Sequence, residues 1–253
     1  MALHLPKVWI LGASSGIGKA LAIELDSQGY RLALSARNEE ALNHLKSSLS
    51  YKHHLVFPLD VNNSAKIHEV SRELANSWGE IDRVVIMSAV YQPMKLGNLE
   101  LSTVRKIIET NLLSVFNILE VVVPVLRSQN QRSQLAICAS AAGYVGLPGS
   151  QPYGSSKAGL IHLVESLKAE YGKSIDIKLI NPGFVESRLT DKNEFYMPFR
   201  ITAEKAAKRI SSGLNSRKFE IHFPKRFTYL MKLVAFLPYR IYFFFFRQRN
   251  DDS

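Results

Sequence analysis

The sequence contains one cysteine, Cys138, among its 253 residues. A single cysteine cannot form an internal disulfide, so the fold does not depend on an oxidising compartment. Because Cys138 lies in the apolar run "QLAICAS", we expect a small core residue rather than a nucleophile. The seven histidines show no spacing typical of metal ligands, and no metal site is predicted.

The chain also lacks a Pro-, Gly- or Ser-rich linker, an internal repeat and a low-complexity tract. One large domain over 1–224, followed by an aromatic and basic helical tail over 225–253, is therefore favoured over two small domains. The first apolar run is short and feeds directly into a glycine turn, without a small-residue cleavage site. We expect a first strand there rather than a signal peptide, and hence a cytoplasmic protein.

Acidic residues are fewer than basic ones, which gives a net charge of +10. A basic surface attracts anions such as cofactor phosphates, lipid headgroups or nucleic acid. Nucleic acid is disfavoured, because no recognition motif accompanies the charge. The apolar fraction of 46% is that of a globular chain with a sizeable core.

Short apolar runs alternate with helix-length segments along most of the chain. Strands are expected near 7–11, 31–35, 54–58, 82–88, 134–140, 175–181 and 218–222. Helices are expected over 16–28, 38–49, 64–77, 102–127, 154–171 and 203–214. This alternation predicts the α/β class, with a doubly wound Rossmann-type parallel sheet of about seven strands in a single domain.

A glycine-rich turn, "GASSGIG", joins the first expected strand to the first expected helix. Glycines allow a tight turn, and the free N–H groups at the start of a helix attract a phosphate. The alternative is a plain strand-to-helix turn. The candidate cofactor-binding residues of this turn are Gly12, Ser14, Ser15, Gly16, Ile17 and Gly18.

The end of the second strand indicates which dinucleotide binds. An acidic residue there would contact the ribose 2′-hydroxyl of NAD, but the sequence has Ala36 followed by Arg37. We therefore expect NADPH to be preferred over NADH, the alternative being a solvated arginine at a helix start. Asp60 and Val61 end the third strand and are expected beside the adenine, although Asp60 could instead be a helix N-cap.

The stretch "QPYGSSKAG" places Tyr153 four residues before Lys157, on one face of a helix. A nearby ammonium lowers the pKa of a phenol and makes it a better-matched acid or base. Alone, such a pair is more often a surface pair than a catalytic one.

In order along the chain, these motifs resemble the classical short-chain dehydrogenase/reductase family over about Lys7 to Phe223. The motifs are "GASSGIG", "DV" at 60–61, an asparagine in "IIETNLLSVFNI", a serine in "CASAAG", "YGSSK" and "NPG". The resemblance implies that Tyr153 donates the proton, that Lys157 lowers its pKa and holds the nicotinamide ribose, and that Ser140 binds the substrate oxygen. It implies further that Asn111 holds a water for proton relay, and that the nicotinamide is walled by Pro182, Gly183, Val185 and Ser187.

One motif departs from the family pattern. The usual Asn-Asn-Ala-Gly after the fourth strand is replaced by "MSAV", in which only Ala89 survives as a cofactor-binding residue. Ser88 is a candidate to replace one asparagine's hydrogen bonds, while Val90 places a Cβ where glycine allows close approach.

Two aromatic segments remain. Residues 184–202 contain Phe184, Phe195, Tyr196, Met197 and Phe199, which suggests either a lid over an apolar substrate or a loop packed on its own domain. In the tail, Phe227 to Phe246 is as long as a membrane span, but Lys232, Pro238 and Arg240 interrupt it. The tail over 225–247 is expected to contact a membrane surface or a neighbouring subunit, in a dimer or tetramer.

The sequence thus predicts an NADPH-dependent oxidoreductase that reduces a ketone or aldehyde on a small hydrophobic, lipid-like substrate. The alternatives are an NADP-linked alcohol dehydrogenase acting in the oxidative direction and a cofactor-binding scaffold without turnover.

Overall fold

The computed structural model describes residues 5–51, 53–94, 96–188, 190–192 and 196–246. In this part of the chain, seven parallel strands form one sheet in the order β3-β2-β1-β4-β5-β6-β7. The strands are β1 (Lys7–Leu11), β2 (Arg31–Ala36), β3 (Leu55–Pro58), β4 (Arg83–Ile86), β5 (Gln134–Cys138), β6 (Asp176–Pro182) and β7 (Glu220–Phe223). The predicted α/β class and doubly wound parallel sheet are confirmed.

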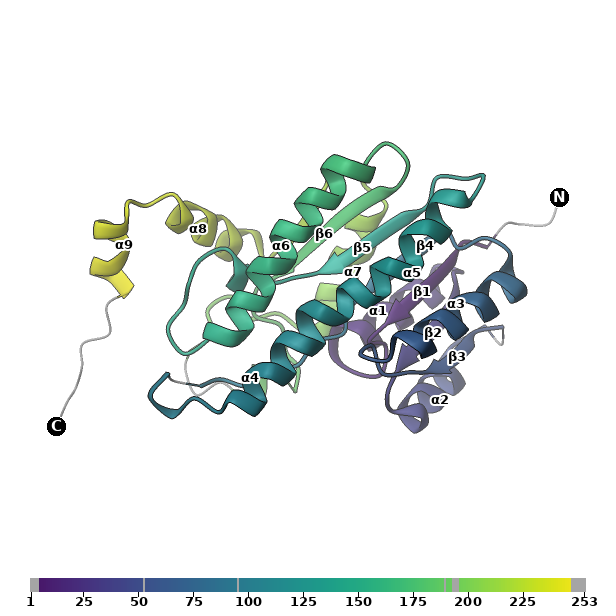
Figure 1. Ribbon diagram of the computed structural model, residues 1–253, viewed down its shortest axis with the longest axis horizontal. Coiled ribbons are helices and arrows are strands. Elements are labelled where there is room, and N and C mark those ends of the chain that lie inside the picture. The colour runs from purple at the N-terminus through teal and green to yellow at the C-terminus, as the bar shows by residue number, and fades with distance from the viewer. Residues whose placement is uncertain (1–4, 52, 95, 189, 193–195, 247–253) are drawn as a thin grey trace.

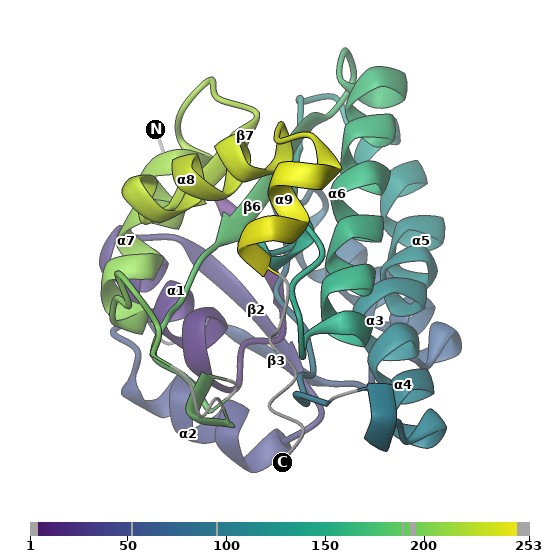
Figure 2. The same ribbon diagram turned by 90° about the vertical axis from the view of Figure 1, so that its left-hand side faces the viewer.

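Helices cover both faces of the sheet (Figures 1 and 2). One layer contains α1 (Gly16–Ser27), α2 (Glu39–Ser48) and α7 (Ala203–Leu214); the other contains α3 (Ser64–Trp78), α5 (Ser114–Ser128) and α6 (Gln151–Tyr171). The strand order reverses between β1 and β4, so the loops after the two strands diverge there. Ligands of open α/β sheets bind at such a reversal, outside the carboxyl ends of the strands.

Alternation along β1 accounts for the two cores. Val8 and Ile10 pack toward α1, α2 and α7, while Trp9 and Leu11 pack toward α3, α5 and α6. Successive side chains of a strand point to opposite faces, and both faces are covered, so the strand is apolar throughout. The indole nitrogen of Trp9 donates to the Ser35 hydroxyl at 2.9 Å, which satisfies its one polar group.

The helix predicted over 102–127 is interrupted by a π-helical turn. It comprises α4 (Leu101–Ile108), a π turn at Glu109–Leu113, and α5. Such turns displace one residue from the regular α-helical register and are frequent at functional sites. By length and composition, Leu101–Ser128 is the one helix of the described chain that could cross a membrane. Since it packs against α3, α6 and the sheet, its core position accounts for that composition.

After β7 the chain forms α8 (Lys225–Ala235) and α9 (Tyr239–Phe246), which extend from one end of the sheet (Figure 1). Phe227, Thr228 and Met231 bury one face of α8, and the Thr228 hydroxyl lies 2.7 Å from Nδ1 of His222 in β7. Each helix is much shorter than the roughly 20 residues that a membrane span needs. The domain division after residue 224 stays a prediction, although α8 itself packs on the sheet.

Candidate active site

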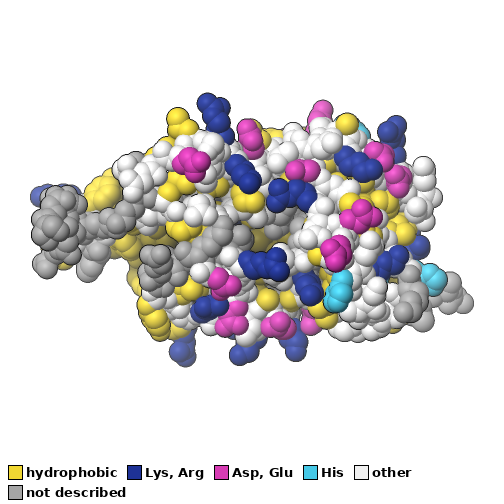
Figure 3. Space-filling view, turned by 90° about the horizontal axis from the view of Figure 1, so that it is seen from below, with side chains coloured by type: hydrophobic (Ala, Val, Ile, Leu, Met, Phe, Trp, Pro, Cys, Tyr) yellow, Lys and Arg dark blue, Asp and Glu magenta, His cyan; other side chains and the backbone are white. Residues whose placement is uncertain are grey.

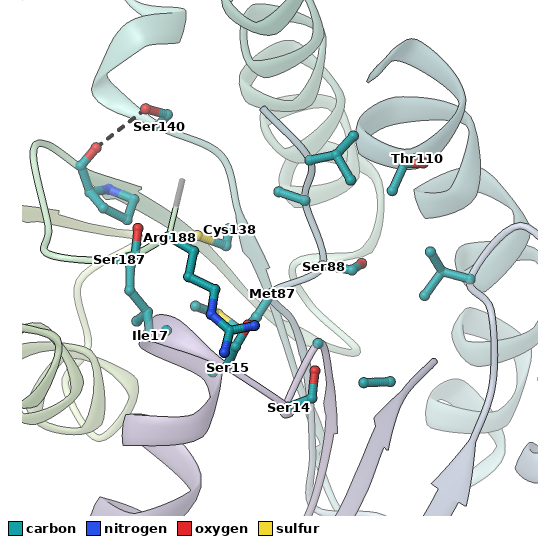
Figure 4. Close-up of a pocket in the computed structure, with 18 of the residues that line it drawn as sticks. Ser14, Ser15, Ile17, Met87, Ser88, Thr110, Cys138, Ser140, Ser187 and Arg188 are labelled. Carbon is teal, nitrogen blue, oxygen red and sulfur yellow. Dashed lines mark hydrogen bonds between the residues drawn. The ribbon is translucent and has the colours of Figure 1, made fainter. Parts of the chain in front are cut away.

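A cavity of about 470 Å³ opens at the carboxyl ends of the strands, at the reversal point. Figure 4 shows side chains of this cavity converging from the glycine turn, the ends of β4 and β5 and the segment after β6. The structure brings to it every predicted cofactor-binding residue and three of the predicted catalytic residues. These are Gly12, Ser14, Ser15, Gly16, Ile17, Gly18, Arg37, Asp60, Val61, Ala89, Ser140, Tyr153, Lys157, Pro182, Gly183, Val185 and Ser187.

The glycine turn owes its shape to two close backbone approaches. Gly12 has a φ of 96°, and a Cβ there would lie 2.6 Å from the Ser88 nitrogen. A Cβ at Gly18 would lie 2.1 Å from the Gly12 carbonyl oxygen. Only glycine fits either position. The glycine at position 18 lets α1 begin close to Gly12, and Gly12 in turn lies against the segment that follows β4.

The start of α1 suits a phosphate. Ser15 is the N-cap residue, yet its side chain makes no capping hydrogen bond, and the first turn contains no acidic residue. The first N–H groups of a helix have no partner within it and carry a partial positive charge. Together with the hydroxyls of Ser14 and Ser15 in the cavity, they form a donor set that fits the diphosphate of a dinucleotide.

At the adenine end, Ala36 and Arg37 line the cavity beside Asp60. The Asp60 carboxylate accepts a hydrogen bond from the Asn62 backbone N–H at 2.9 Å and so stabilises the turn after β3. The alternative that Asp60 is a helix N-cap is wrong, because α3 is capped by Asn63, whose side chain accepts from the Lys66 N–H at 3.0 Å.

The divergent segment after β4 is held by Asn111 of the π turn. The Asn111 amide oxygen accepts from the Val90 N–H at 2.7 Å, and its nitrogen donates to the Val90 carbonyl at 2.9 Å. The same nitrogen donates to the Ser156 hydroxyl at 3.2 Å. Asn111 is therefore fully buried behind the cavity wall, and its predicted water-holding role stays a prediction. Ser88 does not replace an asparagine's hydrogen bonds, because its buried hydroxyl has no partner in the described structure.

Ser140, Tyr153 and Lys157 meet at the other end of the cavity. The Ser140 hydroxyl accepts from the Ala142 N–H at 3.1 Å and donates to the Pro182 carbonyl at 3.4 Å, a long and weak bond that a substrate oxygen could replace. The Lys157 ammonium donates to the Cys138 carbonyl at 2.9 Å and lies 5.6 Å from the centre of the Tyr153 ring.

The predicted net lowering of the Tyr153 pKa by Lys157 is not found, because the effect of burial dominates. Burial raises the pKa of the Tyr153 phenol well above its usual value, while a hydrogen bond with Ser140 opposes the shift. Burial also lowers the pKa of Lys157, which weakens the charge that would stabilise a phenolate. Tyr153 therefore keeps its proton at neutral pH.

Several lining residues were not anticipated from the sequence, among them Met87, Thr110, Arg188 and Thr190. Tyr91 was also missed, and its ring packs edge-on against Tyr153 with the ring centres 4.9 Å apart. Their positions in the sequence could have identified them, because each of these residues lies within, or directly follows, a segment that contains one of the motifs.

An apolar cluster adjoins the catalytic end. Ala141, Phe227 and Met231 form its buried part, against which other side chains pack: Tyr144, Val145, Leu147 and Phe184. Phe184 and Phe227 have ring centres 5.1 Å apart. In the predicted lid, Phe184 is thus packed on the domain, whereas Tyr196 is 87% exposed and Phe195 lies outside the described residues.

One carboxylate, Glu220 of β7, joins the elements around this cluster. It accepts from the Tyr144 hydroxyl at 2.5 Å and from the Asn181 amide at 2.8 Å, and it pairs with Lys232 of α8. Burial alone would raise the pKa of Glu220, but the hydrogen bonds from Lys232, Tyr144 and Asn181 outweigh burial and lower it. The loop after Ser140, the strand before Pro182 and α8 are thereby tied together.

Neither a metal nor a thiol nucleophile is supported by the residues present. Among the described residues, no three His, Cys, Asp or Glu side chains are placed to hold a metal ion. The thiol of Cys138 lines the cavity, but burial raises its pKa, so it is protonated at neutral pH and behaves as an apolar side chain.

Comparison with known proteins identifies relatives. The model of the short chain dehydrogenase family matches residues 6–195. An uncharacterized oxidoreductase of Mycobacterium tuberculosis is 36% identical over 193 residues, which are 74% of this chain and 76% of the relative. One of Myxococcus xanthus is 32% identical over 90% of this chain and 91% of the relative. The 11-beta-hydroxysteroid dehydrogenase A of Sesamum indicum is 31% identical over 75% of this chain and 55% of its own length.

Solved structures share the fold at lower identity. A short-chain dehydrogenase/reductase from Burkholderia phymatum in complex with NAD has a TM-score of 0.82 and 21% identity, covering 92% of this chain and 94% of its own. A short-chain dehydrogenase from Burkholderia cenocepacia in complex with NADP has a TM-score of 0.82 and 16% identity, covering 95% and 97%.

Proposed function

The chain belongs to the short-chain dehydrogenase/reductase family and is an NAD(P)-dependent oxidoreductase acting on carbonyl or alcohol groups, and from this premise we propose that it reduces a ketone or aldehyde on an apolar substrate with NADPH. The observation that carries the proposal is the meeting of Ser140, Tyr153 and Lys157 at one end of the cavity whose other end is the glycine turn.

The cofactor, when bound, supplies the hydride. The Ser140 hydroxyl exchanges its long bond to the Pro182 carbonyl for one to the substrate oxygen and orients the carbonyl. The Tyr153 hydroxyl donates its proton to that oxygen as negative charge develops on it. The Lys157 side chain is held at the end of β5 by the Cys138 carbonyl and lies beside the Tyr153 ring. From there it would hold the ribose of a bound nicotinamide cofactor.

Reduction is the direction we propose because NADPH is the proposed cofactor and supplies a hydride. The Tyr153 phenol carries the proton that reduction consumes, since burial raises its pKa and keeps it protonated at neutral pH. The oxidative direction is the second candidate, and the ratio of oxidised to reduced cofactor would decide between the two.

NADPH is proposed over NADH because of the charge at the end of β2. Ala36 offers no carboxylate to a ribose 2′-hydroxyl, and the neighbouring Arg37 guanidinium can pair with a 2′-phosphate. The apolar substrate is proposed from the cluster of Phe184, Phe227 and Met231 beside the catalytic end. The similarity to a hydroxysteroid dehydrogenase is consistent with a lipid-like molecule.

The Tyr153→Phe variant tests the catalytic assignment. It removes one hydroxyl and keeps the ring that packs against Tyr91. NADPH oxidation should be followed with a panel of steroid, acyl-chain and aromatic carbonyls, and NADPH binding by fluorescence. We expect turnover to fall at least about 100-fold while binding survives. Unchanged turnover would refute the assignment, and binding by the unaltered protein without turnover on any carbonyl would favour the scaffold.

A membrane-surface contact through α8 and α9 is the second part of the proposal. Their outer faces expose Tyr229, Leu230, Leu233, Phe236, Tyr239, Ile241, Phe243 and Phe244. Figure 3 shows hydrophobic side chains gathered toward the C-terminal end of the molecule. Between residues 225 and 246 there are four basic residues, Lys225, Arg226, Lys232 and Arg240, and no acidic residue. Aromatic and basic side chains mixed on short helices suit an anionic lipid surface.

Co-sedimentation with vesicles tests this contact. The full chain should bind vesicles containing phosphatidylserine more strongly than neutral vesicles, and the Phe236→Glu/Phe244→Glu variant should lose binding. Leu113→Glu is the matched control, since Leu113 is 51% exposed elsewhere on the surface. If the variant instead dissociates an oligomer and vesicles are not bound, the same face is a subunit contact. The cytoplasmic location remains a prediction.

A further inference from the structure

Arg188 extends from the segment after β6 toward the glycine turn. In the view of Figure 4 its side chain extends from beside Ser187 and overlies Ser15 of the glycine turn. Both Arg188 and Ser15 line the cavity. The approach is close, because a Cβ placed on Gly16 would lie only 3.6 Å from the Cβ of Ser187. The backbone that carries Arg188 therefore lies directly across the cavity from the first turn of α1.

The base of this arginine is anchored. The Ser187 N–H donates to the Thr190 hydroxyl at 3.0 Å, and that hydroxyl donates to the Val185 carbonyl at 2.7 Å. Val185 is itself 2% exposed and pairs with Ile201 in a parallel bridge. The guanidinium is thus carried on a short, hydrogen-bonded turn.

Charge distribution distinguishes Arg188 from its neighbour in the segment. Arg200 pairs with Glu186 and Asp191, at 3.9 and 3.3 Å. Arg188 pairs with no carboxylate of the described residues and faces a cavity wall whose one acidic residue is Asp60, at the adenine end. The first amides of α1 and the hydroxyls of Ser14 and Ser15 line the same cavity and also favour an anion.

We propose that Arg188 binds the diphosphate of the dinucleotide and closes it against the N-terminal turn of α1. The planar guanidinium can donate two parallel hydrogen bonds to phosphate oxygens from the side opposite the helix amides. Arg37 and Arg188 then serve two different phosphates of one molecule, the 2′-phosphate and the diphosphate. The inference rests on the proposed function, since it presupposes a bound dinucleotide.

The diphosphate is common to both dinucleotides, whereas the 2′-phosphate is present in NADPH alone. Substitution of the two arginines should therefore affect the dissociation constants of NADPH and NADH differently. Arg188→Ala should weaken NADPH and NADH by the same factor, about 10- to 100-fold for the loss of charge-assisted hydrogen bonds. Arg37→Ala should weaken NADPH alone. Adenosine 2′-monophosphate has no diphosphate, so its affinity should fall in Arg37→Ala and remain unchanged in Arg188→Ala.

The experiment measures dissociation constants of NADPH, NADH and adenosine 2′-monophosphate by calorimetry on the full chain. Arg200→Ala is the matched control, an arginine of the same segment whose guanidinium pairs with carboxylates instead. Arg188→Lys keeps the positive charge but not the planar guanidinium that donates two parallel hydrogen bonds. Its loss of dinucleotide affinity should lie between those of the unaltered chain and Arg188→Ala. Since Arg188 is exposed, its effect should shrink as salt is raised from about 0.05 to 0.5 M.

The possible outcomes distinguish a failure of the proposed function from a failure of the role proposed for Arg188. If the unaltered chain binds neither dinucleotide, the proposed function fails. If it binds them and Arg188→Ala changes nothing, or weakens NADPH much more than NADH, the assignment of Arg188 to the diphosphate is overturned while the proposed function stands.

Discussion

The Lys157 ammonium nitrogen lies 2.9 Å from the carbonyl oxygen of Cys138 and donates a hydrogen bond to it. The bond joins the first turns of α6 to the end of β5. Lys157 is 1% exposed, and its side chain lies between the end of β5 and the Tyr153 ring. Lys157 therefore has a structural role, linking α6 to β5, as well as being a source of charge.

Replacing Lys157 by Met should separate these two roles. Loss of the buried hydrogen bond leaves the Cys138 carbonyl without this donor and should lower the free energy of unfolding by about 1–3 kcal/mol, measured in urea. Carbonyl reduction should fall at least about 100-fold, and NADPH affinity should fall too, because the ribose contact is lost. A loss of stability without loss of turnover would limit Lys157 to a structural role.

The Tyr153 phenol should titrate above its ordinary pKa of 10, because burial raises that pKa. The ultraviolet difference spectrum between the unaltered chain and Tyr153→Phe should therefore show little phenolate absorbance from Tyr153 at a pH of about 10, where an ordinary tyrosine is half ionised. A raised folded-state pKa contributes stability that is present below the unfolded value and is lost as the pH rises through the folded value. Phenolate absorbance from Tyr153 near neutral pH would contradict the burial argument.

Arg37→Ala should raise the dissociation constant of NADPH about tenfold or more and leave that of NADH nearly unchanged. The reason is that Ala36 offers no carboxylate to a 2′-hydroxyl, while the neighbouring Arg37 guanidinium lines the same cavity. Ala36→Asp should favour NADH, since it places an acceptor for the 2′-hydroxyl at the end of β2. Equal weakening of both dinucleotides by Arg37→Ala would show that the guanidinium does not read the 2′-phosphate.

Asp26 of α1 should stabilise the fold in a pH-dependent way. Its carboxylate accepts from the Ser50 N–H at 2.8 Å, the Tyr51 N–H at 3.2 Å and His54 at 2.8 Å. Burial alone would raise the pKa of Asp26, but these hydrogen bonds lower it below the ordinary 3.8.

Because the folded-state pKa is lowered, the stabilisation by Asp26 is present above the unfolded value and is lost as the pH falls through the folded value. Asp26→Asn should cost about 1–3 kcal/mol at neutral pH, and the difference from the unaltered chain should narrow in acid. Glu24→Gln on the same helix is the control, since Glu24 is only partly buried and accepts from Gln28 alone among the described side chains. A cost that did not change with pH would argue against the ionised carboxylate.

Glu220→Gln should impair the substrate side of the site more than the cofactor side. Glu220 holds Tyr144 of the apolar cluster and Lys232 of α8, neither of which lines the cofactor cavity. We expect KM for the carbonyl substrate to rise about threefold or more while the NADPH dissociation constant changes little. Glu204→Gln, on the exposed start of α7, is the control. Equal effects on both constants would indicate a general loss of structure.

Local pattern was sufficient for the sheet, for the glycine turn and for the Tyr153–Lys157 pair, whereas Asn111, Ser140 and the residues after β6 were identified by the resemblance to the family. Continuous apolar runs located all seven strands of the described chain, and glycines and the Tyr153–Lys157 spacing located the cavity. The π turn around Asn111 was not predicted. It adds one residue to a single helical turn, and this hardly changes the spacing of the apolar residues along the helix. The start of α6 at Gln151 was placed three residues late, since Pro152 reads equally as a loop residue or as a first-turn residue.

The amino-acid sequence by itself determined the fold, through hydrophobic period and glycines with a unique steric fit, and its motifs, through their resemblance to a family, identified which side chains line one cavity. Only the tertiary structure decided how those side chains behave. Burial raises the pKa of Tyr153, Lys157 turns to Cys138, Asn111 clamps Val90, and Arg188 reaches the glycine turn. Desolvation and contacts between residues far apart in the chain are properties of the assembled fold, and no local pattern encodes them.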